Sequence, residues 1–173
     1  MLIKQVSIEN NAELQDIRVT EGSVAEIATH LTPLQDEKVI DATGKLVIPP
    51  FVDSHVHLDS TQTAGDPEWN ETGTLFDGIR IWSERKQTLT HDDVKKRALQ
   101  TLKIQAAHGL QFVRSHVDVT DPELVALKAL LEVREEVKPW MELQLVAFPQ
   151  EGILSFPHLS LIHISEPTRH AQI

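Results

Sequence analysis

Strand-like and helix-like segments alternate along the chain from Leu46 to Phe148, and this order constrains the fold more than any other feature. A nearly continuous apolar run from Leu46 to Phe51 is typical of a strand buried on both faces, although Pro49-Pro50 should prevent it from pairing along its full length. Further strands are predicted over 111–117 and 142–148, with helices between them. Because such βαβ units cross over with a right-handed sense, the order predicts a parallel sheet in an α/β fold.

The helices between these strands are marked mainly by their first residues. Thr90 is suited to cap the N-terminus of a helix over 92–107, which carries an apolar stripe at helical spacing. A shorter helix is predicted at about 79–85. Asp121-Pro122 provides a capping side chain followed by proline, so the next helix is expected to open there and to run to about Val137.

The first forty residues show a different pattern, in which short β-like stretches are separated by turn signals. We expect these stretches to form a small antiparallel sheet with no chemistry of its own. They cover Leu2–Ile8, 16–20, 24–28 and 38–40.

Composition limits the classes of function. The 173 residues are 40% apolar and 24% charged, with a net charge of -10, which is typical of a globular protein. An acidic chain without a basic stripe does not favour a nucleic-acid partner. The absence of cysteine excludes disulfides and thiolate metal sites, and is compatible with a cytoplasmic protein. The sequence shows no signal peptide at its start and no membrane span.

Two histidines follow the first apolar run, and their spacing indicates a metal site. On a strand, residues i and i+2 face the same side, so His55 and His57 project together while Val56 points away. Neutral imidazole binds zinc and iron well. From the residues alone, an alternative remains open, namely that two polar residues stand where a strand leaves the core.

Several phrases around these histidines carry a family resemblance. The run from Leu46 to Asp53 precedes His55-Val-His57, and later phrases include Gly73-Thr-Leu-Phe-Asp-Gly78 and Val146-Ala-Phe-Pro-Gln150. With them the chain resembles the amidohydrolase superfamily and, within it, the cytosine deaminases. The resemblance covers residues 46–157 strongly and residues 1–45 loosely.

The resemblance implies the first part of a (β/α)8 TIM-like barrel, preceded by part of a small β-sandwich. The expected domains are the sandwich part (1–45), three βα units (46–157) and a tail (158–173). A complete barrel usually takes about 250 residues, so we expect an N-terminal fragment of a longer protein. Residues 159–169 resemble the in-frame translation of a transposase sequencing adaptor, so the tail is expected to be non-native; the other interpretation is a natural short protein.

The resemblance also implies an activity, metal-dependent hydrolytic deamination of cytosine to uracil and ammonia. It implies one divalent metal ion, zinc or iron, and a small pyrimidine as the binding partner, and it leaves a homo-oligomer of the complete protein open. The family's remaining metal ligands and its proton-shuttle residues do not occur in this chain, which we expect to be inactive alone. The implied site residues are His55 and His57 as metal ligands, Gln150, Phe148 and Leu75 around the substrate, and His116 and Asp118 as residues that support the ligands.

Two alternatives are kept beside this interpretation. Relatives with the same frame act on isocytosine, triazines or other cyclic amidines. The chain could also be a non-catalytic fragment or an interaction module. The missing His, Glu, His and Asp residues, sought in the continuing reading frame, would distinguish these cases.

Overall fold

The computed structural model describes residues 1–152 and divides the chain into two units, with the boundary between Pro49 and Pro50. The predicted tail over 158–173 lies outside the described residues. The domain ranges 1–45 and 46–157 stay predictions. Within the described residues no helix is long and apolar enough to cross a membrane.

The first unit is a five-stranded sheet with the order β3-β2-β1-β4, in which β5 also pairs with β1. β1 pairs with β2, and β2 with β3, in antiparallel fashion, whereas β4 and β5 run parallel to β1. The prediction of an antiparallel sheet over the first forty residues is therefore wrong for its last strand, β4, because the chain after β3 returns to the end where β1 begins. The strands are β1 (Leu2–Ile8), β2 (Gln15–Thr20), β3 (Ser23–Ala28), β4 (Val39–Asp41) and β5 (Leu46–Val47).

A buried carboxylate stabilises this small unit. Asp16 is fully buried and accepts hydrogen bonds from the backbone N–H groups of Gln5 and Leu31, each at 2.9 Å. Burial opposes its ionisation, but these two bonds and the ammonium group of Lys4 outweigh burial and lower the pKa of Asp16. Asp16 thus satisfies backbone donors for which the small core around Val6 offers no partner.

The expectation that Leu46–Phe51 forms one buried strand is wrong, whereas the expected interruption of strand pairing at Pro49-Pro50 is confirmed. Leu46 and Val47 pair with β1 of the first unit, and a separate strand, β6 (Phe51–Val56), begins after Pro49-Pro50. Proline has no N–H to donate to a strand ladder, so two in succession divide the run. The side chains of the run Leu46–Phe51 are exposed rather than buried, with exposed fractions of 58% for Leu46 and 54% for Phe51.

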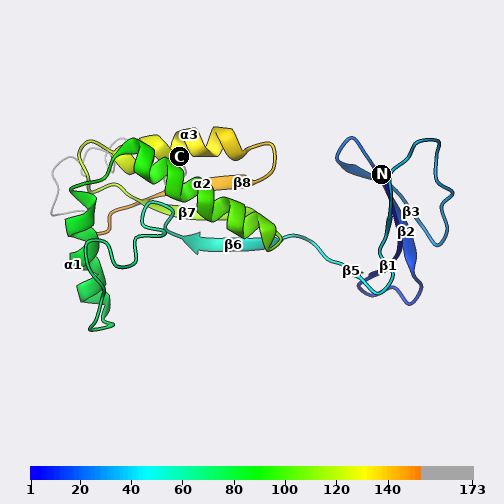
Figure 1. The fold of residues 1–173 in the computed structure, drawn as a ribbon, viewed down its shortest axis with the longest axis horizontal. Helices are drawn as coiled ribbons and strands as arrows, with labels where there is room; N and C mark the ends of the chain where they lie inside the picture. The colour runs from blue at the N-terminus through cyan, green and yellow to red at the C-terminus, as the bar shows by residue number, and fades with distance from the viewer. Residues whose placement is uncertain (153–173) are drawn as a thin grey trace, which may run out of the picture. The chain divides into compact units, whose positions relative to one another are not determined.

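The second unit has the predicted alternating order, and the α/β fold class is confirmed. Its parallel sheet has the order β6-β7-β8, with helices α2 and α3 on one side and α1 beyond the carboxyl ends of the strands (Figure 1). The later elements are α1 (Leu75–Lys86), α2 (His91–Ala107), β7 (Leu110–Asp118), α3 (Val125–Val137) and β8 (Glu142–Phe148).

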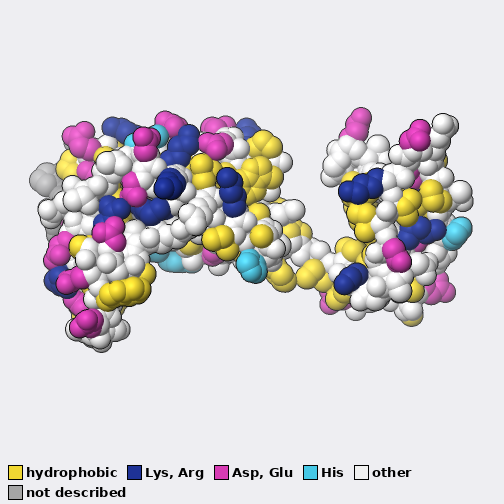
Figure 2. Space-filling model, in the orientation of Figure 1, with side chains coloured by type: hydrophobic (Ala, Val, Ile, Leu, Met, Phe, Trp, Pro, Cys, Tyr) yellow, Lys and Arg dark blue, Asp and Glu magenta, His cyan; other side chains and the backbone are white. Residues whose placement is uncertain are grey.

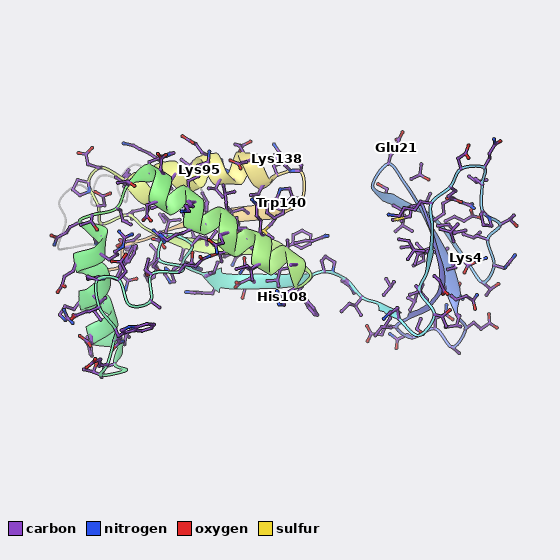
Figure 3. All side chains as sticks on the ribbon, viewed as in Figure 1. Lys4, Glu21, Lys95, His108, Lys138 and Trp140 are labelled. Atoms are coloured by element: carbon purple, nitrogen blue, oxygen red, sulfur yellow. The ribbon has the colours of Figure 1, made fainter. Side chains whose placement is uncertain are left out.

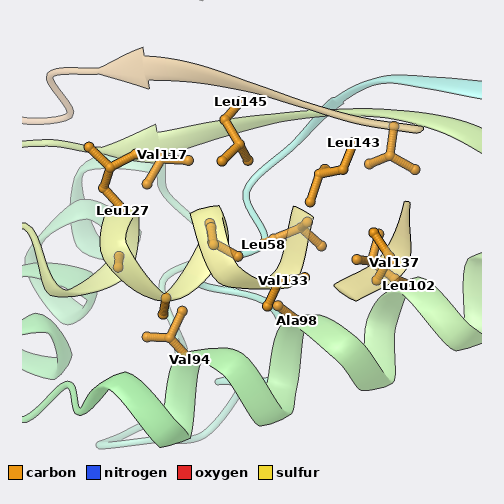
Figure 4. Close-up of a cluster of buried hydrophobic side chains, with 14 of the residues drawn as sticks. Leu58, Val94, Ala98, Leu102, Val117, Leu127, Val133, Val137, Leu143 and Leu145 are labelled. Atoms are coloured by element: carbon orange, nitrogen blue, oxygen red, sulfur yellow. The ribbon is translucent and has the colours of Figure 1, made fainter. Parts of the chain in front are cut away.

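The core lies between this sheet and helices α2 and α3 (Figure 4). Alternate residues of each strand point to one face, so Val113 and Val117 of β7 and Leu143 and Leu145 of β8 enter the core together. The helical stripe predicted on α2 faces them. Its buried members are Val94, Ala98 and Leu102.

Two helix starts differ from the predictions: α1 begins at Leu75, directly after its cap Thr74 and earlier than the predicted position 79, and α3 begins later than predicted. Thr90 caps α2 as predicted, accepting from the Asp93 N–H at 3.3 Å. Helix α3 begins at Val125 rather than at Pro122, because Leu124 has a left-handed φ of 52° that no right-handed helix contains. The Asp121 carboxylate instead accepts the Val125 N–H at 2.9 Å, so it caps from upstream.

The surface of the second unit mixes charges of both signs over α1 and α2 (Figure 2). Arg80 of α1 illustrates this pattern, since it pairs with Glu68, Asp77 and Glu84. Such exposed ion pairs contribute little to stability, so the stability of this unit rests on its core.

Candidate metal and substrate site

Because the sheet is parallel, the carboxyl ends of β6, β7 and β8 lie along one edge, and the predicted site residues follow these ends. A register shift between Asp53 and Val56 modifies β6 there. Asp53 accepts from the Gln105 side chain of α2 at 2.6 Å, and Val56 packs against the core. The residues flanking Val56, His55 and His57, therefore turn to the uncovered face.

The two histidine rings converge. The Nε2 atoms of His55 and His57 lie 3.3 Å apart. Two zinc–nitrogen bonds of about 2.0–2.1 Å at a tetrahedral angle separate their nitrogens by about the same distance. Burial is the main cause that lowers the pKa of His57, and the neighbouring imidazoles of His55 and His116 lower it further. The neutral, metal-binding form of His57 is therefore favoured. The pair thus fits two ligands of one divalent metal ion.

His116 supports this pair through ring contact. Its ring stacks on that of His55 with the centroids 3.9 Å apart, whereas the centroid of His57 lies 5.8 Å away. Its Nδ1 is buried without a hydrogen-bond partner in the described part of the chain. Burial is the main cause that lowers the pKa of His116, and the charges of His55 and Arg114 lower it further.

Among residues 1–152 no group of three or more His, Cys, Asp or Glu side chains could hold a metal ion.

Phe148 packs beside the histidines at the end of β8. Its ring meets that of His57 edge to face, with the centroids 5.1 Å apart, and that of His116 at 6.0 Å. This aromatic contact gives the imidazole pair an apolar neighbour and limits its rotation.

A cavity of about 720 Å³ opens beside the pair. Its lining includes three predicted site residues from separate parts of the chain, namely His57, Leu75 of α1 and Gln150 after β8. His55 and Phe148 are not in the lining but contact His57. Leu75 is 74% exposed, so this side of the cavity is open in the described structure. The structure thus combines a candidate metal pair with a polar amide and an apolar wall.

The long loop between β6 and α1 is fixed by residues that the sequence reasoning did not select. Arg97 of α2 is 8% exposed and donates from Nη1 to the carbonyls of Asp59 at 2.8 Å and Thr61 at 2.7 Å. Gly65 has a φ of 83°, and a Cβ there would come within 2.9 Å of the Trp69 indole. Glycine therefore allows the Trp69 indole to approach the backbone of residue 65 closely and to form part of the cavity wall.

Asp59 and Asp118 connect the strand ends. Asp59 is 1% exposed and accepts the backbone N–H of Asp118 at 2.8 Å; burial raises its pKa to about 6. Burial also opposes ionisation of Asp118, but hydrogen bonds from Thr120 and Lys86 outweigh it and lower the pKa of Asp118. Asp118 was predicted to support the metal ligands. The structure places its carboxylate against Lys86 and Trp82 of α1, each at 3.1 Å.

Residues 38–167 match the amidohydrolase family profile. A crystal structure of 5-methylcytosine deaminase from Klebsiella pneumoniae, liganded with 5-fluorocytosine, is 45% identical with a TM-score of 0.86, over 95% of this chain and 40% of that one. The N-isopropylammelide isopropylaminohydrolase structure from Burkholderia multivorans is 26% identical with a TM-score of 0.77, over 95% of this chain and 41% of that one.

Among curated proteins, the N-isopropylammelide isopropyl amidohydrolase of Pseudomonas sp. (strain ADP) is 30% identical over 158 residues. That match covers 88% of this chain and 39% of the relative. The chain therefore spans about two fifths of the length of these relatives. On the family match and the site geometry together, the chain belongs to the amidohydrolase family.

Proposed function

We propose that the complete protein containing this chain hydrolyses the exocyclic C–N bond of a cytosine-type ring. Water adds at the ring carbon and ammonia leaves, so cytosine gives uracil and ammonia. The observation that carries the proposal is the convergence of His57 and Gln150 on one cavity, with the His55 Nε2 3.3 Å from that of His57. The 45% identity to a 5-methylcytosine deaminase supports the choice of ring.

His55 and His57 would hold one divalent metal ion, zinc or iron. The chemistry that such an ion supplies when bound is activation of water, whose pKa falls from about 15.7 to about 7. The role of the two histidines is to present neutral nitrogens at a fixed separation. The stacked His116 ring keeps His55 from turning away.

Gln150 would bind the ring and take no part in proton transfer. Its amide offers both a donor and an acceptor, which matches the adjacent carbonyl and N–H edge of a cytosine. Leu75 would supply apolar surface around the ring, and Phe148 would pack behind His57 at the edge of the cavity. A few polar anchors among apolar walls are the usual composition of small-molecule sites.

A triazine is the second candidate substrate. The 30% identity to an N-isopropylammelide isopropyl amidohydrolase over 88% of the chain favours it. An oxo-substituted triazine such as N-isopropylammelide also presents a carbonyl beside a ring nitrogen, so Gln150 could bind either ring. Isocytosine and other cyclic amidines share this edge and belong in the same assay.

The 173-residue chain alone is proposed to be inactive. Two imidazoles bind a metal weakly, because catalytic zinc sites use at least three protein ligands, and residues 1–152 supply no third one beside the pair. The proposed working form is the complete protein in the cytoplasm, with a small-molecule partner and with the homo-oligomeric state open.

The test supplies the complete protein with cytosine, 5-methylcytosine, isocytosine and N-isopropylammelide in parallel and measures the amine released, which is ammonia from the first three rings and isopropylamine from the last. We expect the highest kcat/KM on a cytosine, loss of turnover after chelation, and recovery on adding back zinc or iron. Preference for the triazine would select the second candidate. Turnover that is unaffected by complete metal removal would refute the metal-dependent mechanism.

A further inference from the structure

We propose that Lys86 is a positioning residue, whose ammonium group joins the end of β7 to Glu151 and thereby holds the neighbouring Gln150 in place for the substrate. This inference rests on the proposed function for the role of Gln150. The link itself is a property of the described structure and can be measured separately.

The Lys86 side chain is 12% exposed and its Nζ has three oxygen partners. It donates to Glu151 Oε1 at 2.8 Å, to Asp118 Oδ2 at 3.1 Å and to Thr120 Oγ1 at 2.6 Å. An ammonium group has three donors, so all of its hydrogen-bonding capacity is used. Lys86 therefore joins the last turn of α1 to residues that follow two neighbouring strands.

Two other side chains of α1 strengthen the same connection. Trp82 donates from Nε1 to Asp118 Oδ2 at 3.1 Å, and the Ser83 hydroxyl donates to Glu151. Trp82 also lines the substrate cavity. The helix that supplies one wall of the cavity is thus fixed to the strand ends by the same groups that hold Glu151.

The charges are matched at this point. Burial opposes ionisation of Glu151, but hydrogen bonds from Lys86 and Ser83 outweigh it and lower the pKa of Glu151. Burial likewise disfavours the charged form of Lys86, yet its bonds to Glu151 and Asp118 raise the pKa of Lys86. All three groups are charged near neutral pH, and removal of the ammonium would leave two carboxylates partly buried without their cation.

The link bears on Gln150 because, among residues 1–152, the only other backbone bond that ties the turn to a neighbouring element is the Val119 N–H donating to the Phe148 carbonyl at 3.1 Å, two residues before Gln150. The Gln150 N–H donates to the Phe148 carbonyl at 3.0 Å, and the Gly152 N–H donates to the Pro149 carbonyl at 2.9 Å. Both bonds lie within the turn itself. The bonds of Lys86 and Ser83 to Glu151 connect the turn to α1, so they set the direction in which the Gln150 amide points.

The test compares Lys86→Met with Lys95→Met in the complete protein. Lys95 of α2 also pairs with two carboxylates, Glu132 and Glu136, but on the surface between α2 and α3 (Figure 3). Hydrogen exchange at the backbone amides of residues 148–152 is the first readout. We expect this exchange to be at least about tenfold faster in Lys86→Met and unchanged in Lys95→Met, since of the two lysines Lys86 alone contacts this turn.

Kinetics on the preferred ring are the second readout. Lys86→Met should raise KM and lower kcat/KM by about 10- to 100-fold, the range for loss of a charged hydrogen bond. In a Gln150→Ala background the same substitution should change kcat/KM by less than about threefold, because the residue through which Lys86 acts is already gone.

If Lys86→Met does not fold, Glu151→Gln weakens the same contact while keeping an acceptor oxygen. It should shift both the exchange rate and kcat/KM in the same direction as Lys86→Met.

Unchanged exchange over residues 148–152 overturns the inference whatever the activity. Equal losses of kcat/KM with and without Gln150 also overturn it, because Lys86 would then act on the fold in general. A complete protein that deaminates none of the rings would refute the proposed function instead, and the exchange result would then decide alone whether Lys86 holds the turn.

Discussion

The two faces of the sheet β6-β7-β8 have opposite characters, although they are built by alternate residues of the same strands. On the face under α2 and α3, Val113 is 3% exposed and Leu143 is 5% exposed. On the other face Phe112 is 42% exposed. The uncovered face also carries polar and ring-bearing residues, which are His55, Arg114, His116, Gln144 and Phe148.

The difference shows how one strand serves two purposes. The covered face removes apolar area from water and so supplies stability. The uncovered face presents the imidazoles of His55 and His116 beside His57, which lines the cavity. Substitutions on the first face should therefore change folding, and substitutions at the cavity end of the second face should change chemistry.

The largest effect is expected from His57→Ala on the uncovered face of the complete protein. It removes one of the two proposed metal ligands, so metal content and ammonia release should both fall to background while the thermal midpoint of the chelated protein stays unchanged. His108→Ala, at the exposed C-terminal end of α2, is the matched control and should retain metal and turnover. A full metal stoichiometry in His57→Ala would rule out its assignment as a ligand.

A second comparison uses neighbouring residues of β8 that face opposite sides. Leu145→Ala leaves a cavity in the covered face and should lower the free energy of unfolding by about 2–5 kcal/mol. Val146→Ala lies on the partly exposed face and should cost clearly less. Urea unfolding of both variants measures this contrast, and equal losses would mean that the two faces do not differ as described.

The third comparison contrasts Gln150, in the turn after β8, with Gln144, on the uncovered face of β8. Gln150→Ala leaves polar edges of a bound ring unpaired, which should reduce transition-state binding by about 1–3 kcal/mol and raise KM. Gln144 pairs with Arg114 and lines a different cavity, so Gln144→Ala should leave both kcat and KM near wild type. Wild-type kinetics in Gln150→Ala would return this residue to the status of a turn residue.

The smallest expected effect is a pH dependence of the free energy of unfolding, caused by Asp118 at the carboxyl end of β7. The pKa of Asp118 is lowered below its ordinary value of 3.8, so its ionised form stabilises the fold above that pH. The free energy of unfolding of wild type should exceed that of Asp118→Asn near neutral pH, and the excess should shrink as the pH falls below about 3.8. An excess that grows on acidification would mean that the pKa is raised instead.

Much of the second unit could be predicted because its signals are local. The order of strands and helices, the Thr90 cap and the His55–His57 pair each depend on residues a few positions apart. The predicted strand over 142–148 agrees with β8. The family resemblance carried further information, since it selected Leu75 and Gln150, which line one cavity.

Other features could not be predicted, because they depend on contacts between distant residues. No sequence pattern links Lys86 to Glu151, which is 65 positions away, or Arg97 to the loop after β6. The interruption at Pro49-Pro50 could be predicted from the missing N–H groups, but the pairing of Leu46 and Val47 with β1 could not. The late start of α3 came from the left-handed backbone at Leu124.

The sequence by itself therefore determined the α/β order, the histidine pair and the family, because side-chain periodicity and short spacings act within one element. The tertiary structure alone decided which carboxylates are buried, which ammonium group they face and how their pKa values shift. The physical reason is that burial and charge pairing are set by whichever elements pack together. Asp59 and Asp118 carry the same carboxylic acid, yet packing raises the pKa of one and lowers that of the other.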